Sequence, residues 1–162
     1  MVLVTTKVMA QDVATVSLPA TAVIGYTAGV KVLTLQNPTA GTGFANAVKD
    51  DSYLNYTSIV DALLTNKIQV ALSLAVPNGT TLTITAVPTT GTGTPGTAAT
   101  ATFLGGGVIT VQPVITLIGS CNSGAGILGA KLIYTWKMDA GYTAKAVVST
   151  NITATYTIVA SV

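Results

Sequence analysis

The sequence predicts an all-β protein built as a sandwich of antiparallel sheets, and three observations support this fold class. Only 7% of the residues are charged and 49% are hydrophobic, whereas charged residues make up about 25% of a typical soluble protein. Threonine and valine recur throughout, and both are branched at the β-carbon and fit a pleated sheet well. Short runs that alternate apolar and polar residues are separated by glycine, proline and asparagine, which is the pattern of strands and turns.

The clearest predicted element is a pair of strands on either side of residues 77–79, Pro-Asn-Gly. In the run 67–74 the apolar residues share one face: Ile68, Val70, Leu72 and Leu74. After the turn, Leu82, Ile84 and Ala86 share a face opposite three threonines. Because an Asn-Gly turn between two alternating runs favours a hairpin, we expect these strands to pair with each other.

The remaining alternating runs predict a single sandwich domain of about ten short strands with no helix. These strands are expected near 13–18, 30–36, 53–60, 99–104, 107–118, 131–138, 143–149 and 151–161. Residues 90–97, rich in threonine and glycine, are expected to form an exposed loop. We place the domain at 12–162 and treat 1–11 as an N-terminal extension.

The composition argues against catalysis and against a bound cofactor or metal. The chain contains no histidine, glutamate or arginine, and only five aspartates and one cysteine, so an activated nucleophile or a metal ligand set is hard to assemble. Asp50 and Asp51 could offer oxygen ligands to calcium, but a solvated loop is the better interpretation. Cys121 cannot form a disulfide within its own chain; it is interpreted as a buried thiol, with an intersubunit bridge or a lipid attachment as the alternative.

Charge and hydropathy also limit the partners. The positive charges are seven scattered lysines and the net charge is only +2, which does not favour nucleic-acid binding. No run reaches the roughly 18–20 continuous apolar residues of a membrane helix. Residues 1–10 are too short and too rich in threonine for a complete signal peptide. If the protein is secreted, we expect its leader to have been removed already.

The N-terminal stretch carries the most informative pattern. Its even positions form a mostly apolar face: Val2, Val4, Thr6, Val8, Ala10, Asp12, Ala14, Val16 and Leu18. Fully extended, this stretch would measure about 55 Å at about 3.3 Å per residue, roughly three times the length of an ordinary strand. We therefore expect residues 13–18 to join their own sandwich and residues 2–10 to add as a strand to another copy. The donor residues are expected to be Val2, Leu3, Val4, Thr6 and Val8. An ordinary intrachain strand or a frayed tail is the alternative.

The C-terminal strand alternates in the same way. Ile152, Ala154, Tyr156 and Ile158 share one face, opposite a row of threonines. We expect a core strand that also borders the acceptor groove for the neighbouring copy's N-terminus. Because each subunit would both donate and accept a strand, the contact would be head to tail and would propagate as a filament.

An alternating N-terminal extension, a sandwich body and the closing strand at 151–158, Asn-Ile-Thr-Ala-Thr-Tyr-Thr-Ile, resemble the pilins of bacterial chaperone–usher fimbriae and related donor-strand filaments. Residues 54–58 and 118–121 are also similar to segments of secreted bacterial β-sandwich proteins. The resemblance covers most of residues 12–160 and implies an immunoglobulin-like, pilin-like β-sandwich completed by a neighbour's donor strand. It also implies export to the cell surface. Fimbrial pilins carry a cysteine pair that this chain lacks, which leaves open whether an assembly chaperone and an outer-membrane usher take part.

Two other classes of function fit the same composition. The first is a secreted monomeric adhesin or carbohydrate-binding module, with Trp136, Tyr134, Tyr142 and Tyr53 as a stacking platform for sugars, although core packing is the better interpretation of Trp136. The second is a viral coat or tail component. The glycosylation pattern at Asn55, Asn78 and Asn151 matches what chance would give in a chain rich in threonine and asparagine.

Overall fold

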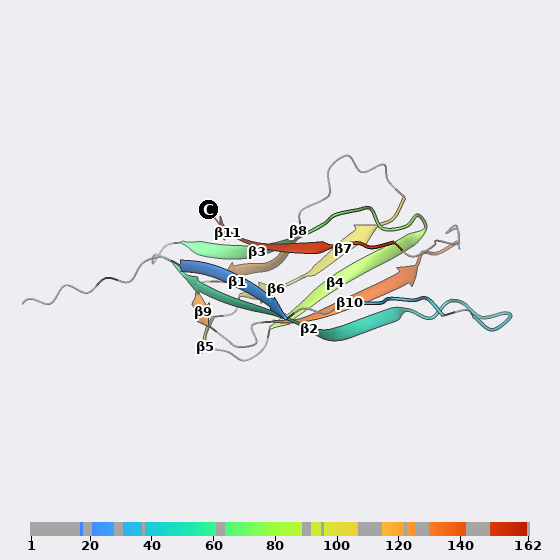
Figure 1. Cartoon of the computed structure of the whole chain (residues 1–162), viewed down its shortest axis with the longest axis horizontal. Helices are drawn as coiled ribbons and strands as arrows, with labels where there is room; N and C mark the ends of the chain where they lie inside the picture. The colour runs from blue at the N-terminus through green and yellow to red at the C-terminus, as the bar shows by residue number, and fades with distance from the viewer. Residues whose placement is uncertain are drawn as a thin grey trace, which may run out of the picture.

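The structure is a computed structural model that describes residues 17, 21–27, 31–36, 38–60, 64–88, 92–94, 96–106, 115–121, 123–125, 130–141 and 150–161. These residues form strands in two antiparallel sheets, without a helix in the described part, as the sequence predicts (Figure 1). The strands are β1 (Thr21–Thr27), β2 (Ala47–Ile59), β3 (Thr65–Leu72), β4 (Thr80–Pro88), β5 (Thr92–Thr94), β6 (Thr97–Ala98), β7 (Thr100–Leu104), β8 (Ile115–Cys121), β9 (Ser123–Ala125), β10 (Ala130–Met138) and β11 (Ala154–Ser161).

The larger sheet is organised around β2, which has 13 residues. Tyr53 and Leu54 pair with both β1 and β10, and Thr57 and Ser58 pair with both β1 and β9. Since one edge of a strand cannot pair with two partners at the same residue, β1 lies on one edge of β2 while β9 and β10 share the other. From β10 the sheet continues through β4 to β7, and from β9 it continues to β5.

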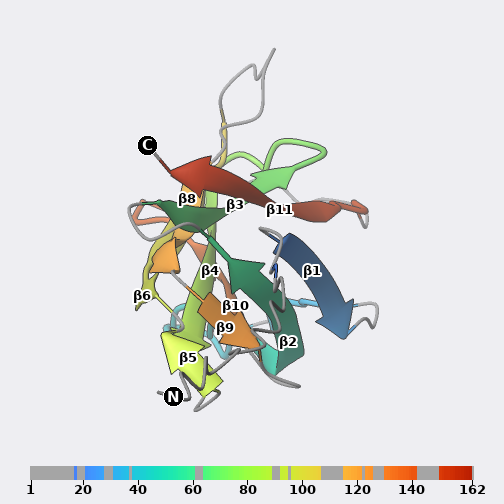
Figure 2. The ribbon, with the colours of Figure 1, turned by 90° about the vertical axis from the view of Figure 1, so that its left-hand side faces the viewer.

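The smaller sheet has the order β11-β3-β8-β6. Figure 2 shows β11 and β3 as one layer, with β1 and β2 in the layer that faces it. The pairing of β11 with β3 runs without interruption from Ala154 opposite Leu72 to Ser161 opposite Thr65. Beyond it, the backbone N–H of Ser73 donates to the Thr153 carbonyl over 2.9 Å. The C-terminal strand is therefore firmly attached along one of its edges.

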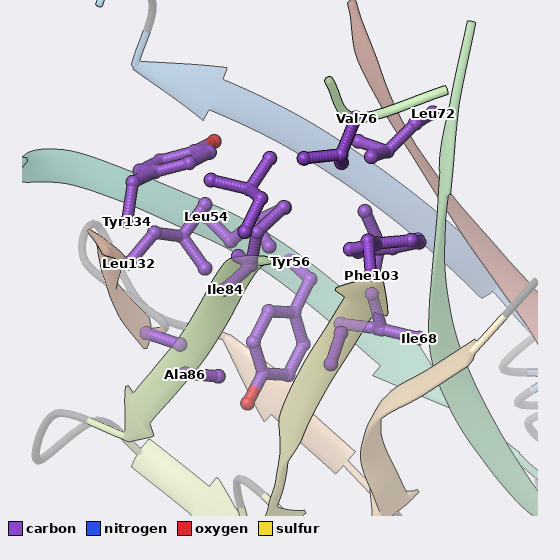
Figure 3. Close-up of a cluster of buried hydrophobic side chains, with 14 residues drawn as sticks. Leu54, Tyr56, Ile68, Leu72, Val76, Ile84, Ala86, Phe103, Leu132 and Tyr134 are labelled. Atoms are coloured by element: carbon purple, nitrogen blue, oxygen red, sulfur yellow. The ribbon is translucent and has the colours of Figure 1, made fainter. Parts of the chain in front are cut away.

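The hydrophobic core lies between the two sheets and is built by alternation along each strand. In β3 every second side chain is buried, and β2, β7 and β10 repeat the pattern over most of their length. Ile68, Ile84 and Leu132 are fully buried and come from both sheets (Figure 3). Two of the buried polar side chains meet each other, where the Asn66 amide donates a 2.8 Å hydrogen bond to the Ser58 hydroxyl. That bond satisfies groups whose burial would otherwise be costly.

The predicted hairpin at residues 77–79 is wrong, although both of its strands exist. β3 pairs with β11 and β8, whereas β4 pairs with β10 and β7, so the connection passes from one sheet to the other. The strand β3 ends at Leu72, and Asn78 and Gly79 therefore do not join two paired strands directly. The apolar faces predicted for the two strands do point into the core, but from opposite sheets; Leu74 is the exception, with 50% exposure.

The connection between the sheets is held by a turn that needs glycine. The Thr80 hydroxyl donates to the Pro77 carbonyl over 2.7 Å, and Gly79 has a φ of 71°, in the region that glycine adopts most readily. Gly105 packs so closely on the Pro77 carbonyl that a β-carbon there would overlap it. Val76 is buried within the connection, which places an apolar side chain where the chain crosses the core.

Several other predictions can be compared with the structure. Strands expected near 53–60, 99–104, 131–138 and 151–161 are confirmed with shifted ends. Residues 31–36 are not in a strand, although their side chains alternate between half-buried and exposed. The loop expected at 90–97 is wrong in part, because β5 and the start of β6 fall within it and pair with β9 and β8. The expected strand at 107–118 is found only as β8, since 107–114 lie outside the described residues. So do the N-terminal extension 1–11 and, Ser17 excepted, the expected strands 13–18 and 143–149.

Replacing a core residue should cost far more stability than replacing an exposed one of similar size. Ile84→Ala removes a fully buried side chain and should lower the free energy of unfolding by about 2–5 kcal/mol. Leu104→Ala, at a side chain that is 68% exposed, should change it by less than about 0.5 kcal/mol. Urea denaturation followed by circular dichroism measures both values, and equal losses would contradict this placement of the core.

Candidate functional site at the β1–β11 seam

The strand β11 forms one edge of the smaller sheet. Within the described part of the chain it pairs only with β3, so alternate backbone N–H and C=O groups along its other edge have no strand partner. Such an edge can accept an additional strand. Across from it, β1 forms an edge of the larger sheet and pairs only with β2 among the described strands. The two edges lie close together (Figure 2), and we call this side of the sandwich the β1–β11 seam.

The inner face of β11 is only partly covered. Ile152, just before the strand, and Ala154, Tyr156 and Ile158 within it are half-buried and pack against the core, in contrast to the full burial of Ile68 and Val70 on the neighbouring β3. Ile24 of β1 is half-buried in the same way. The apolar interior is therefore sealed less completely beneath β11 than beneath β3. An added strand could cover this remaining apolar surface.

Three tyrosines connect the two sheets at the seam. The rings of Tyr26 from β1 and Tyr156 from β11 are stacked, with their centres 5.7 Å apart and their planes inclined by 25°. The Tyr26 hydroxyl donates to the Ser52 hydroxyl over 3.2 Å and lies 3.4 Å from the hydroxyl of Tyr134 on β10. The hydroxyls of Tyr134 and Tyr156 are 2.5 Å apart. Hydrogen bonds and ring stacking thus link two edge strands that do not share a backbone ladder.

Burial controls the protonation of this cluster. It raises the pKa of Tyr134 well above the ordinary value of 10.0, and the nearby hydroxyls of Tyr156 and Tyr26 raise it further. Burial also raises the pKa of Tyr156, although its hydrogen bond with Tyr134 acts in the opposite direction. Both phenols therefore remain protonated at neutral pH and can act as hydrogen-bond donors as well as acceptors.

The seam is electrically neutral along both of its strands. Neither β1 nor β11 contains a charged residue. Charged pairs lie elsewhere, where Lys31 contacts Asp51 over 2.7 Å and Lys131 contacts Asp50 over 2.6 Å. The hydrogen bond from Lys31 holds the pKa of the Asp51 carboxyl below its usual range. An uncharged strand could approach the seam without displacing an ion pair.

The structure places three of the four predicted acceptor residues on one face of β11 at the seam, and the fourth, Ile152, just before that strand. The predicted donor residues Val2, Leu3, Val4, Thr6 and Val8 lie outside the described residues. Sequence reasoning missed β1 and therefore Tyr26, although the alternation of Ala22, Ile24 and Tyr26 in the run 21–27 could have indicated a strand. It also missed the contact between Tyr134 and Tyr156, because these residues meet only once the two sheets face each other.

The alternative sites receive little support from the geometry. Trp136 and Tyr134 lie on the core-facing side of β10, while Tyr53 lies on the opposite face of β2 from the buried Leu54, so these aromatic residues do not form one platform; Tyr142 lies outside the described residues. Trp136 packs against the core, as expected. Asp50 and Asp51 lie in β2, not in a loop, and each contacts a different lysine.

Two further observations concern metals and membranes. Among the described residues, no three carboxylate or cysteine side chains gather where they could hold a metal ion. The described part of the chain also contains no helix long and apolar enough to cross a membrane.

The same chain was compared with known proteins at the level of families, curated sequences and solved structures. No protein-family model, curated protein or solved structure matches it.

Stability should fall at alkaline pH because of the tyrosine cluster. Below pH 10 the phenols of Tyr134 and Tyr156 are protonated in the folded and in the unfolded chain, so they do not make the free energy of unfolding depend on pH. Above pH 10 the unfolded chain releases these protons while the raised pKa of Tyr134 and of Tyr156 retains them in the folded state. The free energy of unfolding should then fall by at most about 1.4 kcal/mol per pH unit for each tyrosine.

Urea denaturation at intervals between pH 8 and pH 11 measures this slope. Tyr156→Phe should be less stable than the parent protein at pH 8, because it loses a hydrogen bond, but should show a shallower decline above pH 10. A decline of the same steepness in both proteins would rule out Tyr156 as one of its sources.

Proposed function

We propose that this protein is a structural subunit of an extracellular filament, in which residues 2–10 of one copy add as a strand to the free edge of β11 in the next. The observation that carries the proposal is made at the β1–β11 seam. There β11 has an edge that pairs with none of the described strands, and its apolar inner face is only half-buried. In this interpretation the fold is an immunoglobulin-like, pilin-like sandwich that its neighbour completes.

The proposed occupant matches the seam in both chemistry and length. Residues 2–10 alternate like β11, and their even face offers three valines. Burying about four aliphatic side chains of this segment would contribute roughly 6–10 kcal/mol before the cost of ordering the strand. The segment contains one charge, Lys7, on its odd face, which would point away from the apolar interior when the even face points inward.

Head-to-tail addition explains why such a protein would form filaments and not closed dimers. The donating segment and the accepting edge are different parts of the surface, so each new subunit presents another free edge. The near absence of charge also suits dense packing of subunits, because few charged groups must leave water. In this proposal the filament lies outside the cell.

Removing residues 1–10 should yield a folded, less stable monomer, because the donor strand is lost while the sandwich body remains. Electron microscopy should show filaments of the parent protein and none of the truncated one, and a synthetic peptide of residues 1–10 should raise the melting temperature of the truncated protein. If the truncated protein still polymerises, the donor assignment is wrong.

Two single substitutions provide a matched comparison. Val4→Asp places a charge on the face expected to enter the neighbour and should abolish filaments, whereas Thr5→Asp places the same charge on the opposite face and should permit them. Size-exclusion chromatography distinguishes polymer from monomer in both cases. A monodisperse parent protein without filaments would favour the monomeric binding module instead.

A further inference from the structure

The seam carries hydroxyl groups at one level of an otherwise apolar face. Along the inner face of β11, the flanking Ile152 and Ala154 on one side and Ile158 on the other are apolar, and only Tyr156 carries a hydroxyl. The ring of Tyr26 stacks on it from β1. Tyr26 is 38% exposed, whereas Tyr134 is 7% exposed. Tyr26 is thus the more exposed of these two residues, and its hydroxyl lies where the exposed ring meets the buried Ser52.

The donor segment has the same arrangement. On its even face, Val2 and Val4 on one side and Val8 and Ala10 on the other are apolar, and only Thr6 carries a hydroxyl. The Tyr26 oxygen donates its proton to Ser52, and a phenol oxygen has two lone pairs. It can accept a further hydrogen bond from a threonine side chain.

We propose that Thr6 of the donating copy hydrogen-bonds to the hydroxyl of Tyr26 in the accepting copy, and that this bond sets the register of the added strand. The inference rests on the proposed function, since it specifies how the two copies align at the same seam. In the chosen register Thr6 lies level with Tyr156, and the valines lie level with the apolar residues of β11. In this alignment the Thr6 hydroxyl meets its partner whether the added strand runs parallel or antiparallel to β11.

Other registers are penalised for two different reasons. A slip of one residue turns the apolar face of the donor toward solvent. A slip of two residues keeps that face inward but moves Thr6 among apolar side chains, where its hydroxyl loses its partner, and brings a valine to the tyrosine cluster. The loss of one buried hydrogen bond corresponds to a preference of about tenfold for the correct register.

Cysteine cross-linking between copies measures the register directly. Thr155 and Thr157 are exposed on the outer face of β11, and Thr5 and Lys7 flank Thr6 on the outer face of the donor. In the proposed register both donor positions lie opposite Thr155 or Thr157, whereas a two-residue slip moves one of them opposite Thr153 or Val159. Pairs of single cysteines at these positions, in a Cys121→Ser background, report each register as a disulfide-linked dimer after oxidation of the filaments.

The ratio of in-register to slipped cross-links should exceed about tenfold in the parent protein and should fall by about tenfold in Thr6→Val and in Tyr26→Phe. The double variant should lose no more than either single one, because both changes remove the same bond. Thr6→Ser keeps a hydroxyl and should retain the preference for the proposed register. Tyr53→Phe removes a hydroxyl from the face of β2 that points away from the core, and it should leave that preference unchanged. Thermal unfolding checks that every variant is folded.

The outcomes separate this inference from the proposed function. If filaments form and cross-link along β11, but the ratio is the same in Thr6→Val, Tyr26→Phe and the parent protein, the hydroxyl bond does not set the register and only this inference fails. If no filament forms and no intersubunit cross-link appears at any of the four positions in or next to β11, the proposed function itself is wrong.

Discussion

The structure depends on the burial of alternating side chains between two facing sheets. Every second residue of β3 points inward, into the same buried cluster as side chains from β4, β7 and β10 of the other sheet. Since few charges are available, stability must come mainly from this burial and from the backbone ladders. Two of the buried polar side chains, Asn66 and Ser58, are compatible with this interior because they bond to each other.

The same constraint explains why the seam is distinctive. A sandwich is well covered in its centre, but its edge strands expose backbone groups, and natural proteins often protect them with charges or prolines. Neither β1 nor β11 contains such a residue. At the seam the protection consists of one stacked pair of rings and a group of hydroxyls, which cover a short part of the edge and leave the inner face of β11 half-buried. We interpret the exposed remainder as the surface that a second copy covers.

Local pattern was sufficient to predict much of the fold. Alternation located β3, β4, β7, β10 and β11 and correctly assigned inward-facing residues such as Ile68 and Ile84. It could not show which strands pair, because an Asn-Gly turn is compatible with a hairpin whenever the flanking strands reach it, and β3 ends too early to do so. The strand β1 was missed because Gly25 interrupts its β-branched run. The tyrosine cluster could not be found from the sequence, since its members lie on three strands far apart in the chain.

The passage of the chain from one sheet to the other at residues 73–79 has a consequence for how this protein reaches its folded state. Because β3 and β4 are not neighbours in a sheet, β3 pairs instead with β8 and β11, which both come much later in the chain. Ser73 and Thr153, which are hydrogen-bonded where β11 joins, are separated by 80 positions. Closing so large a loop costs conformational entropy before the contacts of the ladder can stabilise the chain, and this slows folding. During that interval β3 has an open edge of its own, and a strand from another chain could take it before β11 arrives.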